Sequence, residues 1–182
     1  ETRDDAVGEA YDKVARKLNM PYPGGPHIDH LAKQGKATYS LPRAWLEEGS
    51  LDFSFSGLKS AVINLMHNLE QKNEPISPEN MAASFQESVL DVLIQKTEQA
   101  LERYSVNHLI VAGGVAANLG LRAELEKLKK RKGIQISIPP LALCTDNAAM
   151  IGAAGYVAYQ NGVRAGMDCN AEPGLNLDDF SS

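Results

Sequence analysis

The sequence predicts an α/β fold, and two observations carry this prediction. Two short apolar segments, 109–112 and 134–138, have the composition of strands. Helix-like segments lie between them and after them, so strand, helix, strand and helix follow one another. This order is typical of parallel strands joined by a right-handed crossover.

The composition is that of a globular protein with a real core. Hydrophobic residues make up 43% of the 182 residues and charged residues 23%. The formal charge of −5 argues against a surface that is basic all over, although a local patch could still meet a polyanion. Cys144 and Cys169 lack metal-type spacing, which favours a reducing compartment over a disulfide scaffold.

The sequence favours a cytoplasmic location. No stretch approaches the ~20 apolar residues of a membrane span, and no signal peptide is recognisable. We therefore expect a cytoplasmic protein without a membrane partner. Because Glu1 stands where an initiator Met would and amphipathic helix follows within a few residues, we also expect a fragment of a larger protein.

The first half of the chain is predicted to be mostly helical. Residues 5–19 place apolar side chains at intervals of four, which predicts an amphipathic helix. A loop is expected over 21–26, because three prolines fix φ and two glycines free it. A short helix over about 27–34 follows.

The next segment, 36–55, is predicted to be irregular, with 53–56 as a short strand or a loop rim. A helix is expected to begin at Ser56 or Gly57. Ser77 starts a further helix, since a serine cap, a proline and a carboxylate stand in succession. This helix should run to about Tyr104, and its wide apolar face makes it a core helix.

The α/β core follows. Residues 109–112 are expected to form a fully buried strand, 115–130 a helix and 134–138 a second strand. The last long helix is expected over 146–160, before an extended acidic tail. Three small residues of this helix are expected to allow close packing: Gly152, Ala153 and Gly155.

The glycine pair Gly113 and Gly114 joins the first strand to the following helix. Amides at such a turn, together with the positive end of the helix, can bind an anion without a charged side chain. Neither of the standard glycine-rich phosphate-binding patterns can be read here. A plain strand-to-helix turn therefore stays open as the alternative.

Polar and glycine residues gather at four places where a core does not require them. Because ligands of an open α/β sheet bind beyond the carboxyl ends of its strands, Asn118 and Asp146 should approach each other. The four places are Asp12, the segment 22–26, the turn 112–118 and the segment 144–147.

Each candidate residue could instead have a purely structural or solvated role. Asp146 could cap the last helix, as could Thr145, or it could bind a metal such as magnesium. Asn118 is either a solvated first-turn residue or a hydrogen-bond partner of a sugar hydroxyl or base. Asp12 is either a solvated helix residue or part of a site.

Three further features are secondary. His27 and His30 could share a helix face, but no third ligand is nearby, so a metal pair is a minor alternative. The basic run 127–132 suits a solvated helix end, with contact to RNA phosphates as its alternative. Cys144 is expected to be a small buried residue, because it has no obvious histidine partner to make it a nucleophile.

Six motifs, read in order, resemble the tRNA adenosine threonylcarbamoyltransferase family. The resemblance spans nearly the whole chain, which looks like the carboxyl-terminal half of a bacterial member. The motifs lie at 4–16, 22–26, 52–59, 83–86, 111–118 and 144–150.

The resemblance implies the actin-like ATPase (ASKHA) fold, shared by actin, Hsp70 and sugar kinases. This chain would be one ribonuclease-H-like lobe with helical insertions, truncated at its N-terminus. It would divide into a helical insertion over 20–105, an α/β core over 106–162 and an extended tail over 163–182.

The implied activity is the transfer of a threonylcarbamoyl group from threonylcarbamoyl-AMP to the exocyclic amine of the adenosine beside the anticodon in ANN-decoding tRNAs. The implied partners are tRNA, a paralogous subunit and a small ATPase. A divalent metal, iron or zinc, is also implied, with Asp146 as one ligand. The residues that match nucleotide or substrate positions are Asp12, Gly25, Asp29 and Asn118, with Gly113 and Gly114 forming the turn; no catalytic residue is identified.

Several parts of the family pattern are missing. The chain contains neither the H-x-x-x-H metal ligands, nor the Ser-Gly-Gly-His turn, nor the strands that precede the first helix. A single carboxylate cannot hold the metal, so the isolated chain is expected to be inactive. An ATP-dependent kinase of the same fold would share the Gly-Gly turn but would not explain the motifs at 53–58 and 144–147; a non-catalytic lobe that binds nucleotide, tRNA or a partner is the other alternative.

Overall fold

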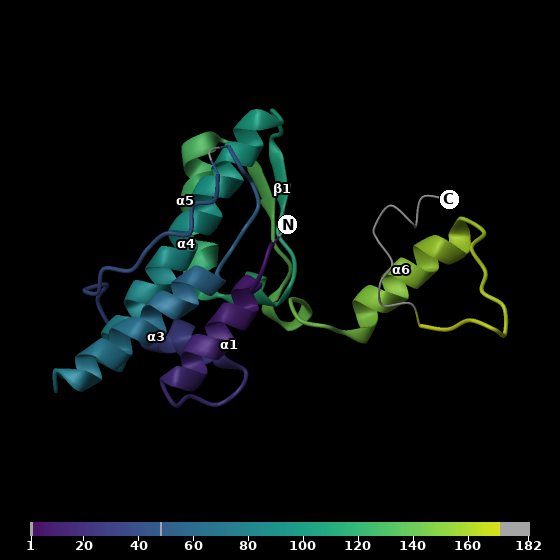
Figure 1. The fold of residues 1–182 in the computed structure, drawn as a ribbon. Coiled ribbons are helices and arrows are strands. Elements are labelled where there is room, and N and C mark those ends of the chain that lie inside the picture. The colour runs from purple at the N-terminus through teal and green to yellow at the C-terminus, as the bar shows by residue number, and fades with distance from the viewer. Residues whose placement is uncertain (1, 48, 172–182) are drawn as a thin grey trace. The chain divides into compact units, whose positions relative to one another are not determined.

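A computed structural model describes residues 2–47 and 49–171, which divide after Thr145 into two compact units (Figure 1). The elements are α1 (Val7–Lys17), α2 (Gly24–Ala32), α3 (Ser56–Gln71), α4 (Pro78–Arg103), β1 (His108–Ile110), the 3-10 helix η1 (Gly114–Ala117), α5 (Leu119–Lys132), β2 (Gln135–Ser137), the 3-10 helix η2 (Leu141–Leu143) and α6 (Ala148–Gln160). Only α6 and the residues around it belong to the second unit.

The larger core of the first unit lies where α1, α2, α3 and α4 meet. The middle of the apolar stripe predicted for the first helix is confirmed, because Ala10 and Val14 are fully buried in α1. Its first member, Ala6, precedes the helix and is exposed. The helix start predicted at Ser77 is also confirmed: its Oγ accepts a hydrogen bond from the backbone N–H of Asn80 at 3.2 Å. From there α4 runs through both cores of the unit, as a core helix should.

The smaller core joins the second half of α4 to α5 and to a two-stranded sheet. The predicted parallel arrangement is confirmed, with Leu109 opposite Ile136. The prediction that the first strand is fully buried is wrong, because Ile110 is 73% exposed. Successive strand residues point to opposite faces. Leu109 and Ile136 pack on the smaller core, while the other face of this sheet is left open in the described part of the unit.

Two predicted boundaries are corrected. The short helix α2 begins at Gly24, three residues earlier than expected, because Pro26 falls in the first turn, where its missing N–H costs no hydrogen bond. The helix expected over 115–130 is split: η1 is followed by Asn118 in extended conformation, and α5 then begins at Leu119. Around Phe53, an isolated bridge to Thr2 replaces the short strand that was one of the two expectations.

The second unit contains α6, whose apolar side chains are mostly exposed. Asn147 caps this helix by accepting from the N–H of Met150 at 3.0 Å, so neither Thr145 nor Asp146 is the cap residue. The close packing expected at its glycines stays a prediction, as does the division at 105 and 162. Much of the predicted acidic tail lies outside the described residues. No described helix is long and apolar enough to cross a membrane.

Candidate functional site

A network of polar side chains lies where α1, α2, α4 and α5 meet. Gln86 of α4 is its centre: Nε2 donates to Asp29 Oδ1 at 3.2 Å, and Oε1 accepts from Asn118 Nδ2 at 3.0 Å. The hydroxyl of Tyr11 also donates to Gln86 Oε1, at 3.3 Å. Tyr11, Asp29 and Gln86 are all buried. Buried polar groups of this kind are stable only when they satisfy one another.

Burial and the negative charge of Asp29 raise the pKa of the Tyr11 hydroxyl far above its usual range. Tyr11 therefore remains a neutral hydrogen-bond donor at every physiological pH. The side-chain amide of Gln86 forms hydrogen bonds through both of its polar atoms, because its oxygen accepts and its nitrogen donates. The network is thus fixed in one hydrogen-bonding pattern.

The beginning of α5 is held by two side chains of this network. Asp29 accepts hydrogen bonds from the backbone N–H groups of Leu119 and Gly120, at 3.3 and 3.2 Å. Asn118 is the N-cap, and its Oδ1 accepts from the N–H of Leu121 at 2.7 Å. Asn118 is therefore the N-cap of α5 and not a solvated first-turn residue. The expectation that the positive end of this helix is open to an anion is wrong, because a carboxylate of the protein already occupies it.

A second carboxylate holds the beginning of α2. Asp12 Oδ1 accepts from the backbone N–H of Gly24 at 2.7 Å, whereas its Oδ2 makes no hydrogen bond within the described residues. Gly24 permits a close crossing of α1 and α2, since a Cβ there would lie 2.4 Å from the Cβ of Ala15. At Gly25 the surroundings are open, and a Cβ would meet no atom within 4 Å.

The glycine turn lies between β1 and α5. Gly113 has φ of +91°, a conformation that glycine adopts without strain. A Cβ at Gly113 or Gly114 would meet no atom within 4 Å, so the backbone is open to approach. In the described part of the chain, the N–H groups of Gly114 and Val115 donate no hydrogen bond. These two amides are the available anion donors of the turn.

The glycine turn and the beginning of α2 lie along the same face of α1. Gly8 faces the turn, because a Cβ on Gly8 would lie 3.6 Å from Cγ2 of Val115. Asp12, one helical turn later, faces Gly24. Residues four apart on a helix are neighbours, with ~6 Å between them along the axis. The open glycines of both segments therefore border one region.

Arg122 of α5 connects the segments that follow the two strands. Its Nε donates to the carbonyl of Ala116 in η1 at 2.6 Å, and its Nη2 donates to the carbonyl of Pro139 at 2.6 Å. Nη2 also lies 3.2 Å from Sγ of Cys144. Cys144 is 4% exposed, which confirms the prediction of a small buried residue.

Asp146 is the first residue of the second unit, so the expected approach of Asn118 and Asp146 stays a prediction. Within the described residues, no group of three or more His, Cys, Asp or Glu side chains could hold a metal ion. Of the histidine pair, the ring of His30 lies 3.0 Å from the side-chain amide of Gln34. The described residues therefore do not fit a complete metal site.

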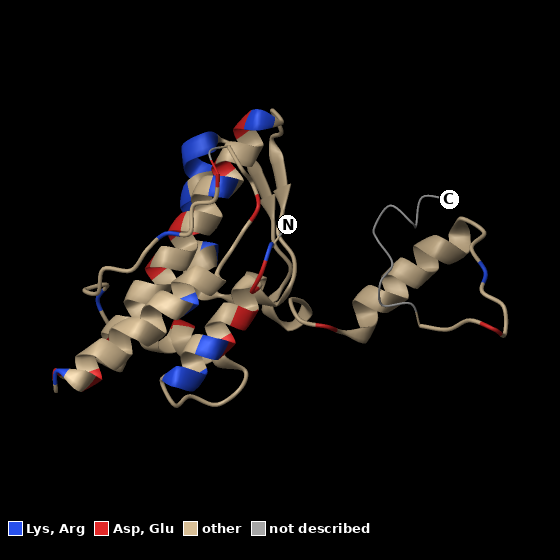
Figure 2. Cartoon of the chain, in the orientation of Figure 1, with Lys and Arg blue, Asp and Glu red and all other residues tan. Residues whose placement is uncertain are grey.

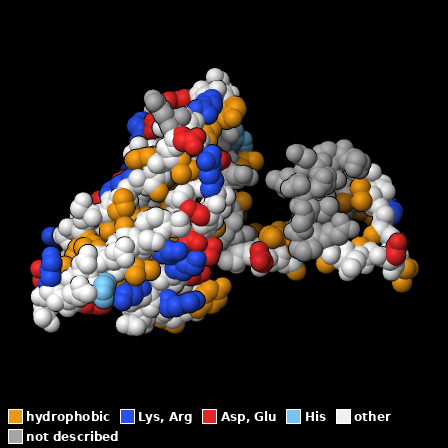
Figure 3. Space-filling view, in the orientation of Figure 1, with side chains coloured by type: hydrophobic (Ala, Val, Ile, Leu, Met, Phe, Trp, Pro, Cys, Tyr) orange, Lys and Arg blue, Asp and Glu red, His pale blue; other side chains and the backbone are white. Residues whose placement is uncertain are grey.

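Figure 2 shows the basic run at the end of α5 in blue. Several of its side chains form ion pairs with carboxylates. Lys132 pairs with Glu98 and Glu102 at 2.8 and 2.6 Å, and Arg131 pairs with Glu98 at 2.7 Å. Lys127 pairs with Glu124 at 2.7 Å. On the visible face, basic and acidic side chains alternate over the first unit (Figure 3). These pairs support the interpretation of the run as a solvated helix end.

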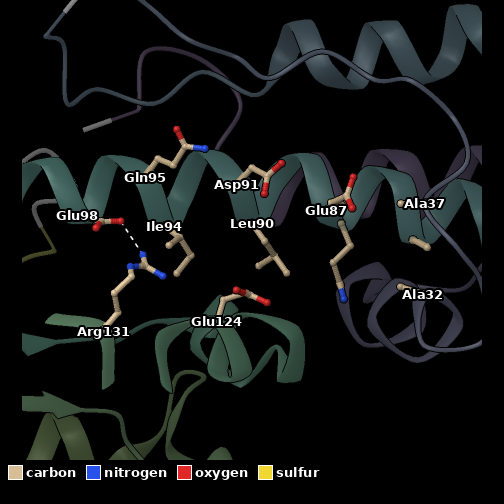
Figure 4. Close-up of a pocket in the computed structure, with 12 residues that line it drawn as sticks. Ala32, Ala37, Glu87, Leu90, Asp91, Ile94, Gln95, Glu98, Glu124 and Arg131 are labelled. Atoms are coloured by element: carbon tan, nitrogen blue, oxygen red, sulfur yellow. Dashed lines mark hydrogen bonds and ion pairs between the residues drawn. The ribbon is translucent and has the colours of Figure 1, made fainter. Parts of the chain in front are cut away.

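A cavity of about 460 Å³ opens between α4 and α5, with Gln86 among its lining residues. Leu90 and Ile94 point from α4 toward α5, and Glu98 reaches Arg131 across the gap (Figure 4). The cavity thus has an apolar floor and a rim whose acidic groups already have partners.

Two residues of the site, Tyr11 and Gln86, were missed by sequence reasoning. Gln86 follows the buried Phe85, and the residues one helical turn before and after it, Ala82 and Leu90, are apolar. A polar side chain at a predicted core position was the available signal, because such a group needs a buried partner. The sequence does not indicate which partner that is.

A model of the family described as "TsaD: tRNA N6-adenosine threonylcarbamoyltransferase" matches residues 1–153. Two curated proteins of that name, from Bacillus licheniformis and Geobacillus thermodenitrificans, are each 64% identical to this chain, over 99% and 97% of its length. The chain spans about half of their lengths, 53% and 52%.

Among solved structures, the crystal structure of HypF from T. kodakarensis matches 87% of this chain with a TM-score of 0.62. The match covers 20% of the HypF chain at 19% sequence identity. At this identity the likeness concerns the fold alone.

Proposed function

Because the chain belongs to the tRNA N6-adenosine threonylcarbamoyltransferase family, we propose that it forms the adenylate-binding part of an enzyme of tRNA modification. The enzyme transfers a threonylcarbamoyl group from threonylcarbamoyl-AMP to the exocyclic amine of the adenosine beside the anticodon in ANN-decoding tRNAs. Its partners are tRNA, a paralogous subunit and a small ATPase, and it acts in the cytoplasm.

The proposed architecture is a ribonuclease-H-like lobe of the actin-like ATPase fold. The parallel pair of β1 and β2, joined through α5, supports this proposal. The similarity to part of HypF is a second, independent support for a shared fold.

The observation that carries the proposed site is the common face of α1, which brings Gly8 and Asp12 beside the two open glycine segments. On this face, Asp12 has one oxygen anchored by Gly24 and one oxygen without a hydrogen bond. A carboxylate held in this way suits a ribose hydroxyl, because it accepts a hydrogen bond without having to be reoriented.

The remaining parts of an adenylate have matching groups nearby. The N–H groups of Gly114 and Val115 suit the phosphate, and glycine allows it to approach the backbone. Gly25 leaves the backbone of α2 similarly open. The second hydrogen of Asn118 Nδ2 is directed to the Tyr11 hydroxyl oxygen at 3.5 Å, which makes a weak hydrogen bond. We assign this hydrogen as the one that Asn118 donates to the ligand.

Asp29 has a different part in the proposed site. Asp29 is buried, and its oxygens accept hydrogen bonds from the side chain of Gln86 and from two backbone N–H groups of α5. It also forms an ion pair with Lys33. We assign it the task of holding α5, and with it Asn118, at the edge of the adenylate pocket.

The metal of the proposed enzyme is iron or zinc, with Asp146 as one ligand. When bound, such a metal polarises a carbonyl group of the substrate. Because the described residues do not fit a complete site for it, no step is derived through the metal. The task of this chain is to bind and orient the adenylate.

The test is calorimetric titration of the chain with AMP and with a non-hydrolysable analogue of threonylcarbamoyl-AMP. Asp12→Asn should weaken binding by about tenfold, because the amide can still accept from Gly24 but presents an N–H₂ to the ribose. Glu9→Gln, a change on the exposed side of the same helix, is the control.

Three results would count against the proposal. Absence of nucleotide binding would remove its basis. ATP hydrolysis with a sugar acceptor and magnesium would favour the kinase alternative. Stoichiometric binding without turnover, by a protein of the full length of its relatives, would favour a non-catalytic lobe.

A further inference from the structure

Arg122 is the one arginine that connects the two segments following β1 and β2 in the described part of the chain. Its guanidinium donates to the carbonyl of Ala116 on one side and to the carbonyl of Pro139 on the other, both at 2.6 Å. It also reaches Sγ of Cys144 at 3.2 Å. No carboxylate lies within ion-pair distance of it among the described residues.

The partners of this partly buried charge are neutral groups. An arginine in such a position gains most from a carboxylate, which offers two charged acceptors to its planar fork. Arg122 instead donates hydrogen bonds to two backbone carbonyls and contacts a thiol. The effect of these bonds is geometric: they set the distance between two loops that share no strand or helix.

The two loops are those that matter for the proposed site. Ala116 belongs to η1, two residues after the open glycine turn, and it is buried. Pro139 and Cys144 frame the segment from which the chain reaches Asp146 two residues later. The side chain of Arg122 is thus the direct link between the proposed adenylate turn and the segment Pro139–Cys144.

We propose that Arg122 is a positioning residue that holds the glycine turn in register with the segment Pro139–Cys144, so that the turn is fixed in the geometry that receives the phosphate of a bound adenylate. This inference rests on the proposed function for its catalytic consequence. Its structural part, the clamp itself, stands on the three contacts of the guanidinium.

The clamp is tested first without any activity. In a Cys169→Ser background, Cys144 is the remaining thiol of this chain, and its rate of reaction with a thiol reagent measures how often the segment opens. Arg122→Gln should raise this rate by about tenfold, since the loss of two charge-assisted hydrogen bonds favours opening. Arg103→Gln is the matched control, because Arg103 also donates to a carbonyl, that of Gly49, at 2.7 Å, far along α4.

The catalytic consequence is tested in a protein of the full length of its relatives that carries this chain. Arg122→Gln should lower kcat for threonylcarbamoyl transfer at least about tenfold, while KM for threonylcarbamoyl-AMP changes less than about threefold. The adenylate still binds, but the glycine turn that receives its phosphate is less well fixed and holds it less often in the reactive geometry. Arg122→Lys should recover part of kcat, because a lysine keeps the charge and can reach one of the two carbonyls.

The outcomes separate the clamp from the proposed function. Unchanged reactivity of Cys144 in Arg122→Gln overturns the clamp, whatever the enzyme does. Thermal denaturation measures the fraction of unfolded protein in Arg122→Gln. If kcat falls only in proportion to this fraction, Arg122 has a merely structural role, and the inference is overturned. Faster reaction of Cys144 in a protein that binds no adenylate upholds the clamp and refutes the proposed function instead.

Discussion

Asn118 donates a hydrogen bond from its side chain to that of Gln86 at 3.0 Å, although 32 residues separate them in the chain. The bond joins the cap of α5 to the middle of α4, and Gln86 passes the connection on to Asp29. The position of Asn118 therefore depends on a side chain from a distant part of the sequence.

Replacement of Gln86 by Leu should lower the free energy of unfolding by about 1–3 kcal/mol. The change leaves the buried polar groups of Asn118 and Tyr11 without their acceptor, and buried unpaired groups carry a cost of this size. Urea denaturation measures the effect. Gln95→Leu, on the exposed side of α4, should stay within about 0.5 kcal/mol of the wild type; equal effects of the two changes would contradict the network.

Replacement of Gly24 and of Gly25 by alanine should have different effects on the free energy of unfolding. Gly24→Ala places a methyl group 2.4 Å from that of Ala15 and should destabilise the crossing of α1 and α2 by about 1–3 kcal/mol. Gly25→Ala meets no atom and should leave stability within about 1 kcal/mol, since alanine favours the helix.

The second readout of this pair is nucleotide affinity. Gly25→Ala should weaken binding of AMP although the protein remains folded, because its methyl group projects into open space that the proposed ligand uses. If Gly25→Ala bound AMP as tightly as the wild type in calorimetry, Gly25 would have no place in the pocket.

Asp4 should make stability depend on pH at the acid end. Burial opposes ionisation, but hydrogen bonds from the hydroxyls of Ser54 and Ser56 and from the N–H groups of Phe55 and Ser56 outweigh it and lower the pKa of Asp4 to about 2. The folded state thus favours the carboxylate more than the unfolded chain does. The stabilisation is present above pH ~4 and is lost as the pH falls through about 2.

Melting temperatures of the wild type and Asp4→Asn between pH 2 and 7 test this sign. The difference between the two proteins should be largest above pH ~4 and should shrink toward pH 2. Asp168→Asn, a change of an exposed carboxylate, serves as the control. A difference that grows as the pH falls would show that the carboxylate of Asp4 does not stabilise the fold.

The chain of 182 residues by itself should not transfer threonylcarbamoyl to tRNA. It offers Asp146 as the one proposed metal ligand, and its described residues contain no cluster that could complete the site. Incorporation of labelled threonine into tRNA, with threonylcarbamoyl-AMP supplied, measures the activity. Addition of the preceding half of the Bacillus licheniformis relative is the positive control, and transfer by the chain alone would disprove this expectation.

Elements with strong local signals were predictable. The apolar interval in α1, the serine-proline start of α4 and the parallel order of β1 and β2 all follow from short stretches of sequence. Local sequence places the start of α2 too late, because proline is a typical helix breaker, whereas the first turn of a helix accepts it. The break at Asn118 cannot be predicted from local sequence, because an apolar helical pattern continues across it.

The sequence by itself determined the family and most of the helical segments, because both are written in local composition and spacing. It also indicated candidate residues for chemistry, which stay predictions. Only the tertiary structure decided what those residues do to one another. It showed that Asp29 occupies the helix end expected to bind an anion, and that Gln86 and Tyr11 support Asn118. The physical reason is that a buried polar group is stable only with a partner, and the fold chooses this partner from distant parts of the chain.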